Sequence, residues 1–311
     1  MNPKEKLFFI LFFISAVWIT DGQDFYQEGL RFYQNKQYKQ AENQFSKNLN
    51  KHPGHLPTLE YLGDIAVYYK HWDQAIMFYE KLLEAKYDDG NYHFKYGGAI
   101  GLKALHTPKY KALFMIDDIK EHFTKAVTYD TTHIEGHWGL VELYVNLPGI
   151  IGGSTDKAYM YADRLHRLSE VDGLLARGYI ERKDHNVEEA KKLYIEAARV
   201  GMALHTYTNT DSGLQVTESR YTVNRNQLHY QIGKVCAEYK VHSEKGLAHL
   251  NYFIKHNSIK DHISLEWAYY QKAQILLRQS KIPKARTALQ KALKLEPEFK
   301  EAKQLLQSLP K

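Results

Sequence analysis

The sequence predicts an all-α protein, a right-handed solenoid of about seven antiparallel helix pairs followed by a C-terminal capping helix. Three observations lead to this fold class. Small and apolar residues recur at a spacing of 34 residues, only 8 of the 311 residues are Pro, and Ala, Leu, Lys and Glu are abundant. Because one repeat organises the chain, we expect one elongated helical body over residues 23–311.

The repeat is clearest in the first two units. The spacing of 34 residues relates Gly29 to Gly63, Ala41 to Ala75, and Phe45 to Tyr79. A small residue in the first helix of a pair lets the second helix approach closely, and an early Ala in the second helix does the same from the other side. Large apolar residues fill the remaining space, and Pro53 ends the second helix of the first unit.

The later units follow this pattern with more variation. Small residues mark the first helices of the third to sixth units: Gly97, Gly139, Gly178 and Gly233. Extra residues interrupt the third unit around Thr107 to Ile116, and Glu298 to Leu309 are expected to form the polar capping helix. The stretch from His205 to Asn224 is rich in Thr and Ser, and it predicts a long, mobile polar loop.

These residues resemble the tetratricopeptide repeat family over essentially all of residues 23–311. A second resemblance, to exported bacterial tetratricopeptide proteins of unassigned biochemistry, rests on three segments: Leu147 to Ser154, Gln231 to Gly233, and Glu244 to Leu247. The family resemblance implies protein–protein binding, and it names no partner.

Residues 1–22 have the features of a signal peptide. Lys4 and Lys6 precede an apolar run from Leu7 to Ile19, and small residues before Gln23 suggest cleavage there. We expect an exported protein, periplasmic or secreted from a bacterium, with no membrane insertion after cleavage; an uncleaved anchor is the alternative. The chain has one Cys, so it cannot form an intramolecular disulfide, which favours the bacterial periplasm.

The sequence holds no convincing catalytic or metal-binding set, so we expect no enzyme activity, no cofactor and no metal. His133 and His137 are four residues apart but lack the Glu of zinc-protease motifs. His242, His249 and His256 recur every seven residues and are expected to be solvated or to line the groove. Cys236 is expected to be a buried structural thiol and not a nucleophile.

Two further motifs have structural interpretations. The glycine-rich segment from Pro148 to Ser154 lacks the Lys and Ser or Thr of a phosphate-binding loop. It predicts an extended turn, with Ser154 or Asp156 capping the next helix. No clustered basic stripe is present despite the net charge of +6, so nucleic acid is not an expected partner.

The expected function is that of a non-catalytic scaffold that binds a peptide or protein segment. In tetratricopeptide proteins the first helix of each pair lines the concave face. Projecting the helices places ten candidate binding residues there: Tyr26, Tyr33, Tyr68, Phe94, Tyr179, Arg182, Tyr230, Lys234, Trp267 and Tyr270. Tyr and Trp suit this role because they give large amphipathic contact surfaces at low entropic cost. A metal-dependent enzyme or an outer-membrane uptake component on the same framework is the alternative.

Overall fold

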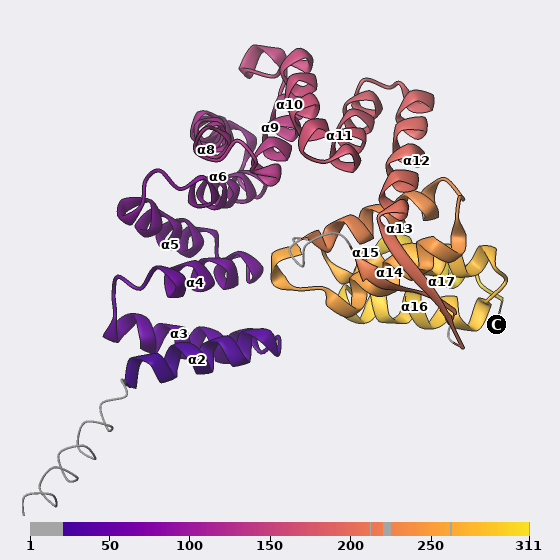
Figure 1. Ribbon diagram of the computed structural model, residues 1–311, viewed down its shortest axis with the longest axis horizontal. Coiled ribbons are helices and arrows are strands. Elements are labelled where there is room, and N and C mark those ends of the chain that lie inside the picture. Colours follow the sequence, from indigo (N-terminus) through magenta and orange to yellow (C-terminus); the bar gives the residue numbers. More distant parts are fainter. Residues whose placement is uncertain (1–20, 212, 220–224, 262, 311) are drawn as a thin grey trace, which may run out of the picture. The chain divides into compact units, whose positions relative to one another are not determined.

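The computed structural model describes residues 21–211, 213–219, 225–261 and 263–310 (Figure 1). The signal peptide predicted for residues 1–22 lies almost wholly outside these ranges. None of the helices within them combines the length and apolar character that crossing a bilayer requires. The chain divides into two compact units, an N-terminal unit that ends at His122 and a C-terminal unit that begins at Phe123.

Helices dominate both units. The N-terminal unit contains α2 (Asp21–Gln34), α3 (Tyr38–Lys51), α4 (Leu56–Tyr68), α5 (Trp72–Ala85), α6 (Gly90–Leu105), α7 (Lys109–Ala112), a 3-10 turn (Leu113–Met115) and the start of α8 (Ile116–Tyr129). The C-terminal unit continues with α9 (Ile134–Asn146), α10 (Thr155–Leu168), α11 (Glu170–Lys183), α12 (Val187–Ala203), α13 (Gln227–Glu238), α14 (Ser243–His256), α15 (Leu265–Arg278), α16 (Ile282–Leu295) and α17 (Lys300–Gln307). Among the described residues these helices form seven successive pairs, with the short α7 inside the third pair and α17 after the last, so the predicted all-α class is confirmed.

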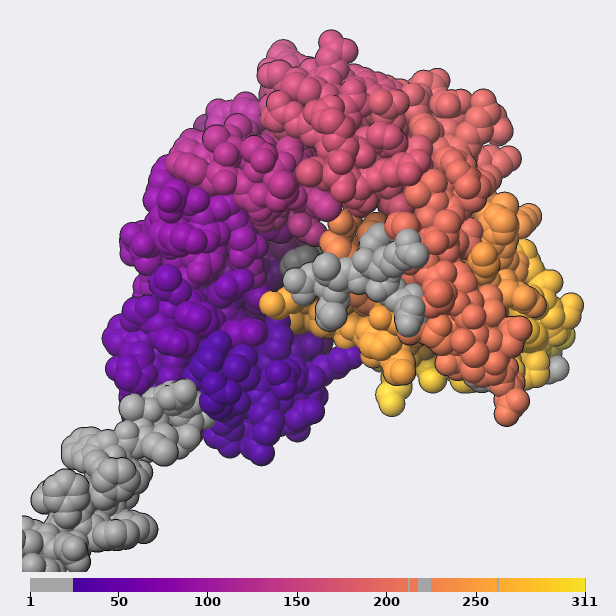
Figure 2. Space-filling model, viewed as in Figure 1, coloured from indigo at the N-terminus to yellow at the C-terminus, as the bar shows by residue number. Residues whose placement is uncertain are grey.

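Glycine in the first helix sets the distance between paired helices, as the repeat predicts. A Cβ atom added at Gly63 would lie 2.2 Å from Cε1 of Tyr79, and one at Gly29 would lie 2.6 Å from the ring of Phe45. These aromatic rings therefore rest directly on the backbone of the facing helix. Figure 2 shows that parts of the chain that follow one another in sequence lie in direct contact within each unit.

The turns inside five of the pairs share one backbone conformation. Each turn contains a residue in the left-handed region, with φ between 57° and 66°: Lys36, Lys70, His185, Lys240 and Ser280. At the first turn, the amide of Gln37 donates back to the carbonyl of Phe32 at 2.9 Å, which closes the helix end. A left-handed conformation costs a non-glycine residue about 1–2 kcal/mol, and the capping hydrogen bonds offset this cost.

The stretch predicted as a mobile loop is instead largely a β-hairpin. Strands β1 (His205–Thr210) and β2 (Gly213–Ser219) pair antiparallel, and β2 lies against α14. The prediction was wrong because it took the Thr-rich composition as a sign of a loop, although β-branched Thr also favours strands. Residues 220–224 of the predicted loop lie outside the described ranges.

Candidate functional site

The predicted binding residues of α2 lie in an aromatic cluster. Tyr33 meets Tyr61 with ring centroids 4.8 Å apart, and Tyr61 stacks on Phe45 at 5.0 Å. Tyr26 packs edge-on against His55 at 4.8 Å. Burial, with the negative charge of Asp64, raises the pKa of Tyr33, so its hydroxyl stays protonated at neutral pH. Tyr26 and Tyr33 are partly buried, and much of their surface is used in packing between the first two helix pairs.

Tyr68 is the most accessible of the predicted aromatic residues in the N-terminal unit. It lies at the end of α4, where 52% of its surface is exposed, and its ring contacts Tyr38 and Tyr69. Phe94 lies on α6 and is partly buried. Tyr68 is therefore the residue of this group with the largest surface left for a partner.

Beside these aromatics, Lys95 joins α6 to two carboxylates of α4. Its Nζ lies 3.1 Å from Oε1 of Glu60 and also contacts Oδ1 of Asp64. Asp64 Oδ1 accepts a further hydrogen bond of 2.8 Å from the hydroxyl of Tyr79. Burial alone would lower the pKa of Lys95, but the carboxylates outweigh it and raise the pKa. The charges thus compensate one another and hold neighbouring helix pairs together.

In the C-terminal unit, Tyr179 and Arg182 lie on α11. The hydroxyl of Tyr179 accepts a hydrogen bond of 2.8 Å from the side-chain amide of Asn146 on α9, and burial raises the pKa of this tyrosine. Arg182 is exposed. These two residues therefore combine a half-buried ring with an exposed positive charge on the first helix of one pair.

Tyr230 is not available for binding, so its assignment to the partner-binding face was wrong. Only 6% of its surface is exposed, and its ring packs on Phe253 of α14 with centroids 5.4 Å apart. Tyr230 precedes Gly233 by three residues, which places both on the helix face that meets the second helix. Lys234, the next predicted residue, is half-buried and lies 3.7 Å from Glu238 on the same helix.

Trp267 and Tyr270 gather around the start of the capping helix. Their ring centroids lie 4.5 Å and 5.3 Å from that of Phe299, respectively. Trp267 keeps 39% of its surface exposed, and the Tyr270 hydroxyl accepts a hydrogen bond of 3.1 Å from Gln274. Both residues lie on α15, the first helix of its pair, and Trp267 offers the larger free surface.

The C-terminal unit also contains a buried carboxylate that no sequence pattern predicted. Asp172 on α11 accepts hydrogen bonds at one oxygen, Oδ1, from Trp138 Nε1 at 2.8 Å and from Arg225 at 2.6 Å. Arg225 also approaches Glu135, with Nε and Oε1 3.9 Å apart. Because Arg225 and Asp172 are 53 residues apart in the chain, no spacing pattern could have revealed the pair.

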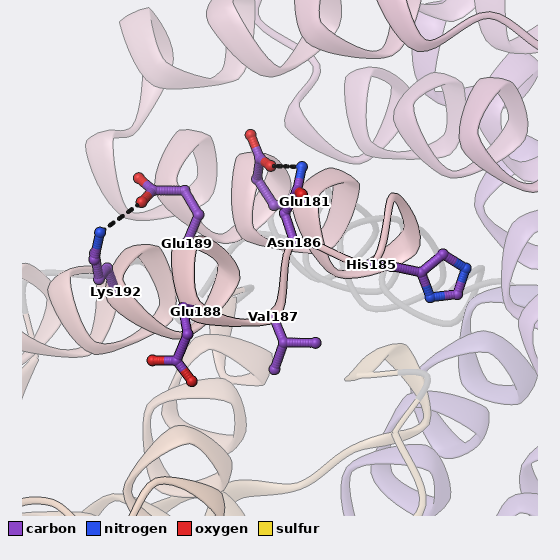
Figure 3. Close-up of a pocket in the computed structure, with 7 residues that line it drawn as sticks. All are labelled: Glu181, His185, Asn186, Val187, Glu188, Glu189 and Lys192. Atoms are coloured by element: carbon purple, nitrogen blue, oxygen red, sulfur yellow. Dashed lines mark hydrogen bonds and ion pairs between the residues drawn. The ribbon is translucent and has the colours of Figure 1, made fainter.

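An open pocket lies at the turn between α11 and α12. Figure 3 shows its lining: Glu181, His185, Asn186, Val187, Glu188, Glu189 and Lys192. Glu181 accepts a hydrogen bond of 2.8 Å from Asn186, and Glu189 pairs with Lys192 at 3.0 Å. The polar groups of these seven residues are engaged with neighbours or directed apart, so they do not converge on a reacting atom (Figure 3).

The histidines that first drew attention have local structural roles. Nδ1 of His133 accepts a hydrogen bond of 3.0 Å from the amide of Gly136 and caps α9. His137 is buried and its Nε2 contacts the carbonyl of Thr131 at 3.0 Å. The thiol of Cys236 is fully buried, as predicted, and burial raises its pKa to about 12.

His249 is not solvated as the sequence suggested, because it lies fully buried in a cluster with His205 and His229. One ring nitrogen from each of the three lies within 4.8 Å of the others. His205 comes from β1, His229 from α13 and His249 from α14. Burial lowers the pKa of each imidazole, that of His229 to about 3, so all three are neutral at pH 7. No pattern in the sequence indicated this cluster, because its members share no regular spacing.

Known proteins resemble this chain in structure. Comparison of the sequence with protein-family profiles finds no match, and a search of curated proteins finds none. A tetratricopeptide repeat protein from Parabacteroides merdae aligns over 92% of this chain and 97% of its own, with 14% identity and a TM-score of 0.49. The Cut9–Hcn1 complex of the APC/C aligns over 93% of this chain, with 12% identity and a TM-score of 0.51. This chain spans 46% of that protein's length, and at 12% identity the similarity concerns the fold alone.

Proposed function

We propose that this chain, whose helix pairs are similar to those of tetratricopeptide repeat proteins, is a non-catalytic scaffold that holds a peptide or protein segment against the first helices of its pairs. One observation carries the proposal: Tyr68 and Trp267 lie on first helices and keep 52% and 39% of their surfaces exposed. Large aromatic residues that are accessible before binding are the ones that most often dominate protein interfaces.

Charged groups on the first helices suit a peptide backbone and mixed side chains. Arg182 is exposed, and Glu60 and Lys234 are partly exposed on first helices of their own pairs. First helices therefore carry charges of both signs, which favours a protein segment over the uniformly negative backbone of a nucleic acid.

Peptide selection on the purified protein tests this proposal. A phage-displayed library of random dodecamers would be selected against the chain, and the dissociation constant of the best peptide measured by fluorescence anisotropy. We expect Trp267→Ala or Tyr68→Ala to weaken binding at least about thirtyfold, because truncating an aromatic hot spot costs about 2 kcal/mol or more.

Second helices supply the matched controls. Met77 on α5 and Leu295 on α16 are similarly exposed apolar residues, at 42% and 50%. Met77→Ala and Leu295→Ala should bind the selected peptide like the unaltered chain. If these two variants weaken binding as much as the first-helix variants do, or if neither first-helix variant changes it, the proposed binding face is wrong.

We also propose that the chain is exported through the signal peptide of residues 1–22. The support is the charged start followed by an apolar run. Expression of the full-length chain in a bacterium, followed by intact-mass measurement of the periplasmic fraction, should show an N-terminus at or near Gln23. A chain that keeps Met1 and sediments with membranes would contradict cleavage and support the uncleaved anchor.

A further inference from the structure

We propose that His205, His229 and His249 form a zinc-binding site that fastens the β-hairpin to the helix pair α13–α14. Within the part of the chain that the structure describes, these form the only group of three or more His, Cys, Asp or Glu side chains close enough to share one ion. Neutral imidazole is a preferred ligand of Zn²⁺, and three histidines with one open position form a recognised zinc-binding set.

The three rings surround a common point. The ring centroids are separated by 4.7 Å, 4.9 Å and 4.9 Å, an almost equilateral triangle. Nδ1 of His229 and Nδ1 of His249 face each other at 2.9 Å. Nitrogens bound tetrahedrally to one Zn²⁺ at about 2.0–2.1 Å lie about 3.3 Å apart, so small side-chain rotations suffice to admit the ion.

Hydrogen bonds already hold the outer nitrogens of two of the rings. Nδ1–H of His205 donates to the carbonyl of Gly201 at 2.7 Å, which leaves Nε2 as the nitrogen able to bind a metal. The hydroxyl of Tyr207 donates to the carbonyl of Met202 at 3.1 Å and therefore accepts from Nε2–H of His249 at 2.8 Å. Such outer contacts fix the tautomer and orientation of ligating histidines.

The residues around the three histidines indicate what the fourth zinc ligand would be. No further His, Cys, Asp or Glu joins the three among the described residues, so a water molecule would occupy the fourth position of the tetrahedron. The ligands come from the first residue of β1 and from the two helices of one pair. Zinc would therefore join the hairpin to the repeat, a role independent of the proposed partner-binding face.

Zinc binding to the full chain tests the proposal. Protein treated with EDTA and desalted would be titrated with Zn²⁺ in the presence of a competing chromophoric chelator. We expect one Zn²⁺ per chain with a dissociation constant below about 1 μM, and a rise in Tm on adding zinc. Co²⁺ in place of zinc should give the intense visible absorption of a tetrahedral site.

Three variants and two controls separate this site from the chain's other histidines. His249→Gln, His229→Gln and His205→Asn should each lower the affinity at least about a hundredfold, as expected when one of three ligands is lost. His122→Gln, from a partly buried contact between two histidines, and His256→Gln, from the exposed end of α14, should bind like the unaltered chain. If His249→Gln fails to fold, the zinc affinity of His205→Asn, at the base of the hairpin, decides the test. Failure of the unaltered chain to bind zinc, or equal binding by all variants, would overturn the proposal.

Discussion

Two helix pairs, one in each compact unit, place a histidine of the first helix against a histidine of the second. In the N-terminal unit, Nδ1 of His93 on α6 lies 2.8 Å from Nδ1 of His122 on α8. In the C-terminal unit, His229 on α13 and His249 on α14 repeat this contact at 2.9 Å. Both pairs are anchored through an outer nitrogen, which contacts the carbonyl of Tyr87 in one and the hydroxyl of Tyr207 in the other.

The two histidine pairs differ in the third ring that lies beside them. Tyr96 lies next to His122 with centroids 4.5 Å apart, so the N-terminal pair is completed by a phenol from its own helix pair. The C-terminal pair is completed by His205, which comes from the hairpin inserted between two repeats. The repeat thus supplies a two-histidine contact in both units, and a segment outside the repeat supplies the third potential metal ligand.

The largest expected effect tests how closely the two helices approach each other in each of the pairs that contain these histidines. A Cβ atom at Gly233 would lie 2.4 Å from Cγ of Leu250 and 3.1 Å from the backbone oxygen of Gly246, whereas one at Gly101 would meet only Ile119, at 4.0 Å. Gly233→Leu should lower the free energy of unfolding by about 3 kcal/mol, because overpacking forces the helices apart. Gly101→Ala should be neutral or stabilising by up to about 1 kcal/mol. Urea denaturation measures both, and equal effects would show that the pairs are packed alike.

The helix pairs themselves could be predicted because glycine and aromatic residues recur where helices touch. Gly29 and Gly63 lie against Phe45 and Tyr79 in the structure, as their spacing indicated. Tyr230 was misplaced because a helix phase inferred from one glycine does not show which neighbouring residues the second helix covers. The histidine cluster could not be predicted, since it depends on a hairpin whose Thr-rich sequence resembles a loop.

A second prediction concerns the simpler histidine pair. Nε2–H of His93 donates to the carbonyl of Tyr87 at 2.7 Å, so its Nδ1 accepts from His122. His122→Leu removes that donor and should cost about 2 kcal/mol of stability, because the buried imidazole of His93 loses this hydrogen bond. Thermal and urea unfolding would measure the loss. Added zinc should not change this loss of stability. If zinc restored the stability of His122→Leu, the two histidine pairs would not differ in metal binding.

A buried histidine outside both pairs gives a third, smaller effect. Burial lowers the pKa of His137, so its folded pKa lies below the value in the unfolded chain. The unfolded state therefore binds more protons, and the stabilising effect is present above about pH 6.5 and declines as the pH falls toward the folded pKa. One proton changes stability by at most about 1.4 kcal/mol per pH unit. Between pH 7 and pH 5 the unaltered chain should lose more stability than His137→Gln does. Parallel stability profiles of the two proteins would show that the pKa of His137 is not lowered by folding.

The smallest expected effect concerns a polar contact between two neighbouring helix pairs that, unlike the histidine contacts, is open to solvent. Arg177 on α11 lies 2.7 Å from Asp163 on α10, but 43% and 46% of the two side chains are exposed. Water and salt screen such a pair, so its contribution is expected to be about 0.2–1 kcal/mol and to shrink as ionic strength rises. Arg177→Met keeps most of the aliphatic stem and should therefore lower the free energy of unfolding by less than about 1 kcal/mol in urea denaturation at low salt. A loss as large as that of His122→Leu, unchanged by added salt, would mean that burial does not distinguish the polar contacts of these helix pairs.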